Sequence, residues 1–289
     1  MNYRHIFHAG NFADVMKHAL LVPLIRAMQR KDKGFLYLDT HAGVGGYDLS
    51  RAEEGDTLKR QPEYPNGIGR LWSHIPVAEP LKAYLSLVKS YNQRQGATGA
   101  ALRFYPGSPW IARLLAREQD RLALVDLHPD DGVALEGEFV FERGVKVHRM
   151  DGYTALKAML PPPEKRALVL IDPPFEAQNE FDQIIRGISE ALKRFPSGVY
   201  AIWYPLTSRA RVDDFRYALM GLPLPPTLMM ELSIAGEQSA IKMRGCGLVV
   251  INPPWQYDRE ADAILSELGE VLTQEPGAGS RLDWLVKEN

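Results

Sequence analysis

The chain has 289 residues, of which 45% are hydrophobic and 24% are charged, and its formal net charge is −2. This is the composition of an ordinary globular protein, and the length allows one large α/β domain or two smaller ones. The single cysteine, Cys246, excludes an internal disulfide framework and cysteine-cluster metal sites. No apolar segment of signal-peptide type follows the first residues, and the apolar run at residues 19–25 is far too short to span a bilayer. We therefore expect a cytoplasmic protein without membrane association.

The first 35 residues are more basic than the chain as a whole. They hold six lysines and arginines against two aspartates, together with three of the seven histidines. A basic stripe beside aromatic residues is compatible with a polynucleotide partner, although a solvated helix face explains the charge equally well. Residues 3–11 (YRHIFHAGN) are predicted to be an ordered tail, neither strand nor helix. Its Tyr3, Arg4 and His5 either contact a substrate base or phosphate, or pack on the body of the protein.

A helix and a strand with a glycine-containing loop follow the tail. Asn11 is predicted to be the N-cap of a helix that extends to about residue 30, and Pro23 could kink that helix. A buried strand at residues 35–39 (FLYLD) then leads into residues 40–47 (THAGVGGY), where Gly43 is a candidate cofactor contact. An acidic residue before a Gly-x-Gly loop resembles the first cofactor motif of class I methyltransferases. The spacing is not Gly-x-Gly-x-x-Gly and no Lys-Ser/Thr follows, so dinucleotide and P-loop sites are weaker alternatives.

Residues 48–107 do not fit a single crossover helix. They are polar at first and then show helical periodicity at residues 68–72 and 81–91, which predicts an inserted, mainly helical subdomain. Such an insertion either shapes a substrate surface or is decoration. We therefore divide the chain into residues 1–47, the insertion, and residues 108–289, which hold the rest of the core and a C-terminal extension. Ser108 lies at the start of a predicted helix, as an N-cap or as a cofactor contact.

The remaining strands predict an open α/β fold, with a mostly parallel, seven-stranded Rossmann-like sheet and helices on both faces. Asp126 ends the second strand, where folds that bind nucleoside cofactors use a carboxylate to accept the ribose hydroxyls. Asp151 and Gly152 end the third strand and are suited to contact an adenine amino group. The predicted strands are residues 121–126, 146–152, 167–171 and 198–205, with a terminal pair at 230–234 and 247–251.

The fourth strand ends in the segment with the clearest chemistry, residues 167–175 (ALVLIDPPF). Its last four residues resemble the Asp-Pro-Pro-aromatic motif of S-adenosylmethionine-dependent amino-methyltransferases. The Asp172 carboxylate and the Pro173 carbonyl could accept both N–H groups of adenine N6, which would aim the nitrogen lone pair at the methyl donor. The Phe175 ring could stack on the base, a contact worth roughly 1–3 kcal/mol.

A second copy of the motif occurs at residues 248–255 (LVVINPPW). Position along the chain decides between the two copies, because class I methyltransferases place the catalytic tetrapeptide after the fourth strand, across from the cofactor loop. Asp172 fits this order. Asn252 follows the last predicted strand, which we place at the far end of the sheet, so we assign catalysis to Asp172.

Segments along nearly the whole chain resemble the RlmJ family, the bacterial 23S ribosomal RNA adenine-N6 methyltransferases. The resemblance implies a Rossmann-like core with an inserted helical subdomain, S-adenosylmethionine as methyl donor, 23S ribosomal RNA as partner and, we expect, a monomer. The segments that carry it are residues 3–11, Asp14, Lys17 and His18, 38–43 (LDTHAG), 105–109 (YPGSP), 117–120 (REQD), 127–129 (LHP), 171–174 (IDPP) and 251–255 (INPPW).

The family pattern also implies roles for single residues. Tyr3 matches a tail tyrosine that contacts the RNA, and two positions depart from the usual pattern: Phe175 stands where tyrosine is usual, and Asp126 where glutamate is common. Phe175 keeps the stacking ring but loses a hydroxyl, and Asp126 keeps its charge on a shorter arm. The implied cofactor contacts are His18, His41, Ser108, Asp126, Asp151, Gly152 and Asp172.

Several alternatives stay open from sequence. The histidines His5, His8, His18 and His41 could suggest a metal site, but neutral imidazoles bonded to a cofactor suit His18 and His41 better, and we expect no metal. A DNA adenine or a protein-amide methyltransferase could use the same motif. A non-catalytic, cofactor-binding RNA factor is the non-enzymatic alternative, and the intact Asp-Pro-Pro-Phe motif disfavours it.

Overall fold

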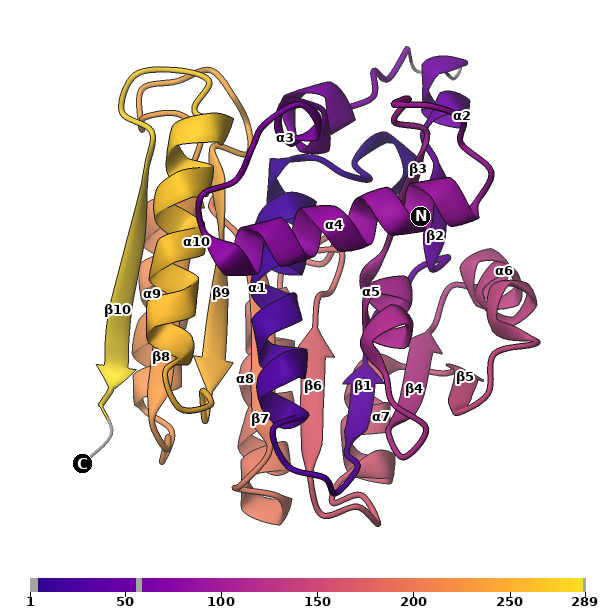
Figure 1. Ribbon diagram of the computed structural model, residues 1–289. Helices are drawn as coiled ribbons and strands as arrows, with labels where there is room; N and C mark the ends of the chain where they lie inside the picture. The colour runs from indigo at the N-terminus through magenta and orange to yellow at the C-terminus, as the bar shows by residue number, and fades with distance from the viewer. Residues whose placement is uncertain (1–4, 56–58, 288–289) are drawn as a thin grey trace.

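The centre of the structure is an eight-stranded sheet in the order β10-β8-β9-β7-β6-β1-β4-β5 (Figure 1). The computed structural model describes residues 5–55 and 59–287. Among the helices in these two ranges, none combines the length and the hydropathy that a membrane span requires. The strands are β1 (Leu36–Asp39), β4 (Arg121–Asp126), β5 (Val145–Arg149), β6 (Ala167–Ile171), β7 (Val199–Pro205), β8 (Thr227–Ser233), β9 (Gly245–Ile251) and β10 (Gly279–Val286).

Five neighbouring strands, β5, β4, β1, β6 and β7, run parallel to one another. Two of them, β1 and β6, are buried along their whole length, which explains the unbroken apolar sequence of β6 and the apolar residues 36–38 of β1. The remaining strands, β9, β8 and β10, pair antiparallel beyond β7. The prediction of a mostly parallel α/β sheet is confirmed, but the predicted number of seven strands is wrong because β10 adds an eighth strand at the edge.

Helices cover both faces of the sheet (Figure 1). One apolar core forms beneath the helices in front of the sheet in that view, and a second forms beneath those behind it. The front helices are α1 (Phe12–Met28), α4 (Glu79–Arg94), α5 (Ser108–Leu115) and α10 (Tyr257–Leu272); those behind are α7 (Gly152–Met159), α8 (Glu180–Arg194) and α9 (Arg209–Met220), and α6 (Pro129–Phe139) lies beside β5.

Helix α1 is almost completely buried, and its start is fixed by the predicted cap. The Asn11 side-chain oxygen accepts hydrogen bonds from the backbone N–H groups of Ala13 and Asp14 at 3.0 and 2.9 Å, which confirms Asn11 as the N-cap. The described part of the tail begins with a single 3-10 turn, η1 (His5–Phe7), rather than with irregular chain. Tyr3 and Arg4 lie outside the described residues.

Residues 48–107 contribute the long helix α4, several short helices and the strand at residues 104–106. The periodicity at residues 68–72 coincides with a helix, and that at 81–91 lies within the longer α4. The strand at residues 104–106 pairs antiparallel with the strand at residues 46–48, which ends the glycine loop. The two strands form a small separate sheet that sequence patterns did not indicate. The elements besides α4 are α2 (Ser50–Glu53), η2 (Tyr64–Asn66), α3 (Ile68–Trp72) and the paired strands β2 (Gly46–Asp48) and β3 (Phe104–Pro106).

Candidate active site

The predicted site residues gather at the carboxyl edge of the parallel strands. Asp39 ends β1 and pairs in register with Leu170 of β6, so the loop after β1 and Asp172 after β6 emerge side by side. From β1 the chain continues to β4 and β5 on one side of β1, and it then returns to β6 on the other side of β1. The strand order therefore reverses between β1 and β6. Open α/β sheets bind ligands at this point.

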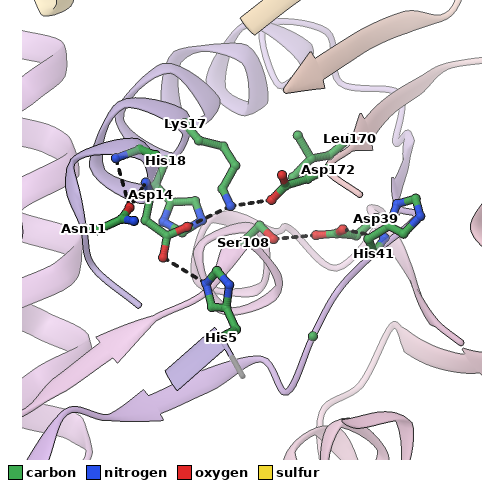
Figure 2. A network of polar contacts seen from close by, with 12 residues as sticks. His5, Asn11, Asp14, Lys17, His18, Asp39, His41, Ser108, Leu170 and Asp172 are labelled. Carbon is green, nitrogen blue, oxygen red and sulfur yellow. Dashed lines mark hydrogen bonds and ion pairs between the residues drawn. The ribbon is translucent and has the colours of Figure 1, made fainter. Parts of the chain in front are cut away.

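A buried lysine joins α1 to the Asp-Pro-Pro-Phe motif (Figure 2). The Lys17 ammonium lies 2.5 Å from Asp172 Oδ2 and 2.8 Å from Asp14 Oδ1. Burial disfavours the charge, but the two carboxylates hold the pKa of Lys17 well above its ordinary value. Burial likewise opposes ionisation of Asp14, and Lys17 and His5 hold the pKa of that carboxyl well below its ordinary value. The ion pairs therefore fix one oxygen of Asp172.

His5 reaches the same cluster from the tail. Its Nε2 lies 3.1 Å from Asp14 Oδ2, the oxygen that also accepts the Gly10 N–H at 3.0 Å, and its ring packs against Tyr47. His5 is thus linked to Asp172 through Asp14 and Lys17. We did not single out Asp14 or Lys17 for the site from sequence. The available signals were a charged pair, three residues apart, in a largely apolar helix, and the presence of both residues in the RlmJ family pattern.

A second acidic group, Asp39, is completely buried beside the glycine loop. Its Oδ2 accepts the Ser108 hydroxyl at 2.7 Å and the Tyr37 hydroxyl at 3.0 Å. Burial raises the pKa of Asp39 to about 6, and the two hydroxyl donors only partly offset this effect. The alternative that Ser108 is a helix N-cap is wrong, because Gly107 occupies the cap and Ser108 is the first residue of α5.

The glycine loop is tied to the end of β4. The Gly43 N–H donates to Asp126 Oδ2 at 2.8 Å, and the His128 N–H donates to Asp126 Oδ1 at 2.8 Å. Gly43 has a φ of +59°, and a Cβ there would lie 2.9 Å from the Tyr47 hydroxyl oxygen, so this turn requires glycine. Burial raises the pKa of Asp126, although both backbone donors oppose the shift. Each Asp126 oxygen retains lone pairs that could accept ribose hydroxyls.

The start of α7 lies directly against this loop. Asp151 caps α7 by accepting the Thr154 N–H at 2.7 Å. A Cβ on Gly152 would lie 2.4 Å from the Thr40 carbonyl oxygen, so only glycine permits this packing. His41 is beside both, and burial lowers its pKa to about 4 despite the nearby carboxylates of Asp172 and Asp151. His41 is therefore a neutral imidazole at neutral pH.

His18 offers an unused polar atom in the core. Its Nδ1 bonds the Tyr105 hydroxyl at 2.7 Å, while its Nε2 is buried and finds no hydrogen-bond partner among the described residues. Burial and the neighbouring Lys17 lower the pKa of His18 to about 3, so the ring is neutral. A buried unpaired nitrogen is costly unless a ligand satisfies it. Together with the Gly43 turn and Asp126, it fits a bound nucleoside cofactor.

The aromatic residue of the motif adopts a strained backbone. Phe175 has a φ of +52°, which is uncommon for a residue with a Cβ and typical of functional sites. Its ring makes edge contacts with Phe181 and Trp203, at centroid distances of 5.0 and 5.7 Å. Pro173 is buried beneath the turn and Pro174 is exposed. The ring is held by these contacts, three residues after Asp172, and Phe175 remains partly exposed.

The second motif lies at the opposite edge of the sheet. Strand β9 runs antiparallel to β7, and Ile251 pairs with Tyr200 at the start of β7. Asn252 therefore emerges at the amino edge of the parallel strands, where its side-chain amide donates to the Pro196 and Gly198 carbonyls at 2.8 and 2.7 Å. Our expectation that it follows the last strand at the far end of the sheet is wrong, since β9 is an interior strand and β10 follows it.

Two features define a class I methyltransferase. In the sheet order, the antiparallel strand β9 lies between β7, the fifth parallel strand, and β8, and the glycine-containing loop lies at the switch point. Residues 32–286 match the family described as ribosomal RNA large subunit methyltransferase D, RlmJ. Two proteins named ribosomal RNA large subunit methyltransferase J, from Escherichia coli K12 and Haemophilus influenzae, are each 40% identical over 288 residues, which cover 100% of both chains. The chain belongs to this RlmJ family of ribosomal RNA methyltransferases, as the resemblance in sequence predicted.

A solved structure supports the same assignment. The crystal structure of a Legionella pneumophila protein is 34% identical, with a TM-score of 0.84 over 96% of this chain and 98% of that one. Because this agreement leaves only 4% of the chain without a counterpart, most of residues 48–107 also lies within the shared fold.

Proposed function

We propose that this protein transfers a methyl group from S-adenosylmethionine to N6 of an adenine in 23S ribosomal RNA, and that Asp172 holds the reacting amino group. The observation that carries this assignment is the placement of Asp172. Its half-buried carboxylate follows β6 at the switch point, and Lys17 fixes one of its oxygens at 2.5 Å. Within the described residues, the other oxygen takes no hydrogen bond and is available to an amino group.

The residues around the loop fit the cofactor. Asp126 would accept the ribose hydroxyls, Asp151 and the Gly152 backbone would face the adenine, and the unpaired His18 Nε2 would gain a partner. His41, Gly43, Ser108 and Asp172 complete our proposed contact set. When bound, the cofactor supplies a methyl group on a positively charged sulfur.

The remaining chemistry belongs to the chain. Asp172 Oδ1 and the Pro173 carbonyl would accept the two N–H bonds of the adenine amino group, which favours a tetrahedral nitrogen with its lone pair directed at the methyl group. Formation of the new N–C bond would break the bond between the methyl carbon and sulfur, the sulfur would leave as a neutral thioether, and the nitrogen would give up one proton to Asp172 or through it to water. Lys17 keeps the carboxylate in position throughout.

Binding of the base calls for an aromatic surface. The target adenine must leave its stack, at a cost of a few kcal/mol that is lower for unpaired RNA. The Phe175 ring, held by its edge contacts with Phe181 and Trp203, would recover about 1–3 kcal/mol by stacking on the base. The tail residues Tyr3, Arg4 and His5 and the surface of residues 48–107 are our proposed RNA contacts.

The test is to incubate the protein with methyl-labelled S-adenosylmethionine and, in separate reactions, protein-free 23S RNA, assembled large subunits and DNA. The products are digested to nucleosides. We expect label in N6-methyladenosine from RNA alone. Label from DNA would favour a DNA methyltransferase, and cofactor binding without transfer would favour an amide substrate or a non-catalytic factor.

A further inference from the structure

A short part of the insertion is bonded to the segment that precedes α1. The Glu63 N–H donates to the Phe7 carbonyl at 2.9 Å, and the Ile68 N–H donates to the Gly10 carbonyl at 2.8 Å. A Cβ on Gly67 would lie 2.1 Å from the same Gly10 carbonyl oxygen, so the two segments are in backbone contact. The insertion therefore holds the N-terminal segment in place.

The Glu63 carboxylate is the polar centre of this contact. Its Oε1 lies 2.9 Å from His8 Nδ1, and its Oε2 accepts the Asn11 side-chain amide at 2.8 Å. Burial favours the neutral acid, but the hydrogen bonds from His8 and Asn11 lower the pKa of Glu63 below its ordinary value. Hydrogen bonds to an ionised acceptor are about twice as strong as those between neutral groups.

Asn11 connects the Glu63 carboxylate to the start of α1. Its amide is held by Glu63, while its oxygen caps the helix through the Asp14 N–H at 2.9 Å. The Asp14 carboxylate bonds Lys17, and Lys17 bonds Asp172. An unbroken series of contacts thus runs from the insertion to the catalytic carboxylate, and Figure 2 shows it from Asn11 onward.

We propose that Glu63 is a positioning residue for methyl transfer: it fixes the cap of α1 so that Lys17 holds Asp172 in its reacting orientation. This inference rests on the proposed function. Methyl transfer depends steeply on the placement of the reacting atoms, and a misplacement of about 1 Å can cost about 100-fold in rate. Glu63 is not among the residues that we place against the cofactor, so its loss should slow transfer within the bound complex, and saturating RNA separates this effect from any loss of RNA affinity.

The first test compares Glu63→Ala with Glu267→Ala. Glu267 is a matched control because it also bonds a histidine, His74, and the Val77 and Ala78 N–H groups, but it fastens the same insertion to α10 instead of to the tail. At saturating cofactor and RNA, we expect Glu63→Ala to lower kcat about 10-fold to 100-fold, with an unchanged cofactor dissociation constant. Glu267→Ala should keep the wild-type kcat even if its melting temperature falls equally.

A second test exchanges the donor and the acceptor in the hydrogen bond between Asn11 and Glu63. Asn11→Asp keeps a capping oxygen but places a carboxylate against Glu63, so kcat should fall as in Glu63→Ala. Adding Glu63→Gln lets the glutamine amide donate to the new aspartate, and kcat should return toward the wild-type value. Hydrogen exchange at residues 8–14 supplies a readout independent of turnover, with faster exchange expected in Glu63→Ala and Asn11→Asp only.

Three results would overturn the proposal: a wild-type kcat in Glu63→Ala, an equal fall of kcat in Glu267→Ala, or no recovery in the double variant. Failure of the proposed function would look different, because the wild-type protein itself would then put no label into RNA adenine.

Discussion

At the scale of single residues, the electrostatics of the site depend mainly on the ion pairs of Lys17. It is buried between two carboxylates from segments far apart in sequence, Asp14 and Asp172. Burial of one cation with two anions is tolerable only while all three are present, since removing one partner of a buried pair typically costs about 3–5 kcal/mol. The sequence placed Asp172 at the site but could not show its partner, because an ion pair across 155 positions depends on the packing of α1 on the sheet.

This arrangement gives a stability prediction. We expect Lys17→Met to lower the free energy of unfolding by about 3–5 kcal/mol, because two carboxylates lose their shared cation. The control is Lys82→Met, which breaks an exposed pair with Glu79 on α4 and should cost less than about 1 kcal/mol. Urea denaturation at neutral pH measures both. Equal losses in the two variants would show that the Lys17 pairs are energetically unimportant.

The buried Asp39 predicts a specific pH dependence. Its pKa is raised by burial from 3.8 to about 6, so between these values the folded protein binds a proton that the unfolded chain has released. Its contribution to stability therefore falls as the pH rises through this window, by about 2–3 kcal/mol in total, and is constant above it.

The check is the difference in unfolding free energy between wild type and Asp39→Asn, measured by denaturation from about pH 3.5 to about pH 7. The wild type should lose stability relative to the variant as the pH rises toward 6. A difference that does not change with pH would mean that Asp39 titrates normally and that its burial has no energetic consequence.

At the scale of elements, the close packing of α7 on the glycine loop shapes the proposed cofactor site. A Cβ on Gly152 would meet the Thr40 carbonyl oxygen at 2.4 Å, and backbone cannot yield as a flexible side chain would. We expect Gly152→Ala to displace the start of α7, to cost about 1–3 kcal/mol in stability and to weaken cofactor binding at least about 10-fold. Calorimetric titration with S-adenosylmethionine measures the affinity.

Gly137→Ala is the matched control for this prediction. Gly137 lies inside α6, and a Cβ added there would have no atom within 4 Å, so alanine should stabilise the protein by about 0.5–1 kcal/mol and leave cofactor binding unchanged. If Gly152→Ala bound cofactor like Gly137→Ala, the close packing of α7 on the loop would have no role in the site.

The elements also show which features were readable from sequence. Residues 167–171 were predicted as a strand because a fully buried strand carries an unbroken apolar run, and β6 has these bounds. Strand β10 was missed because it lies at the exposed edge and its residues 279–286 mix polar and apolar side chains. The motif at Asn252 has the same pattern as the motif at Asp172. It therefore could not show that β9 runs in the opposite direction, which removes Asn252 from the site.

At the scale of the whole molecule, the fold brings together at one edge segments from the tail, the glycine loop, the insertion and the strand ends. Local sequence predicted the loop, Ser108, the acidic strand ends at Asp126 and Asp151 and the Asp-Pro-Pro-Phe turn, whereas His18 and His41 were implied as cofactor contacts by the family pattern. The contacts that join the set, from Glu63 through Asn11 and Lys17 to Asp172, arise only from tertiary packing. The insertion is therefore part of the catalytic framework in our proposal, in addition to any contact with RNA.

The most direct test of the central claim is the single-turnover rate of methyl transfer to RNA by Asp172→Ala at saturating cofactor. The control is Asn252→Gly, which alters the second motif at the opposite edge and suits its φ of +55°. We expect Asp172→Ala to remain folded and to lose about 10²–10⁴ in rate, while Asn252→Gly transfers at the wild-type rate. A folded Asp172→Ala protein that methylates adenine at a rate near that of wild type would contradict the assignment.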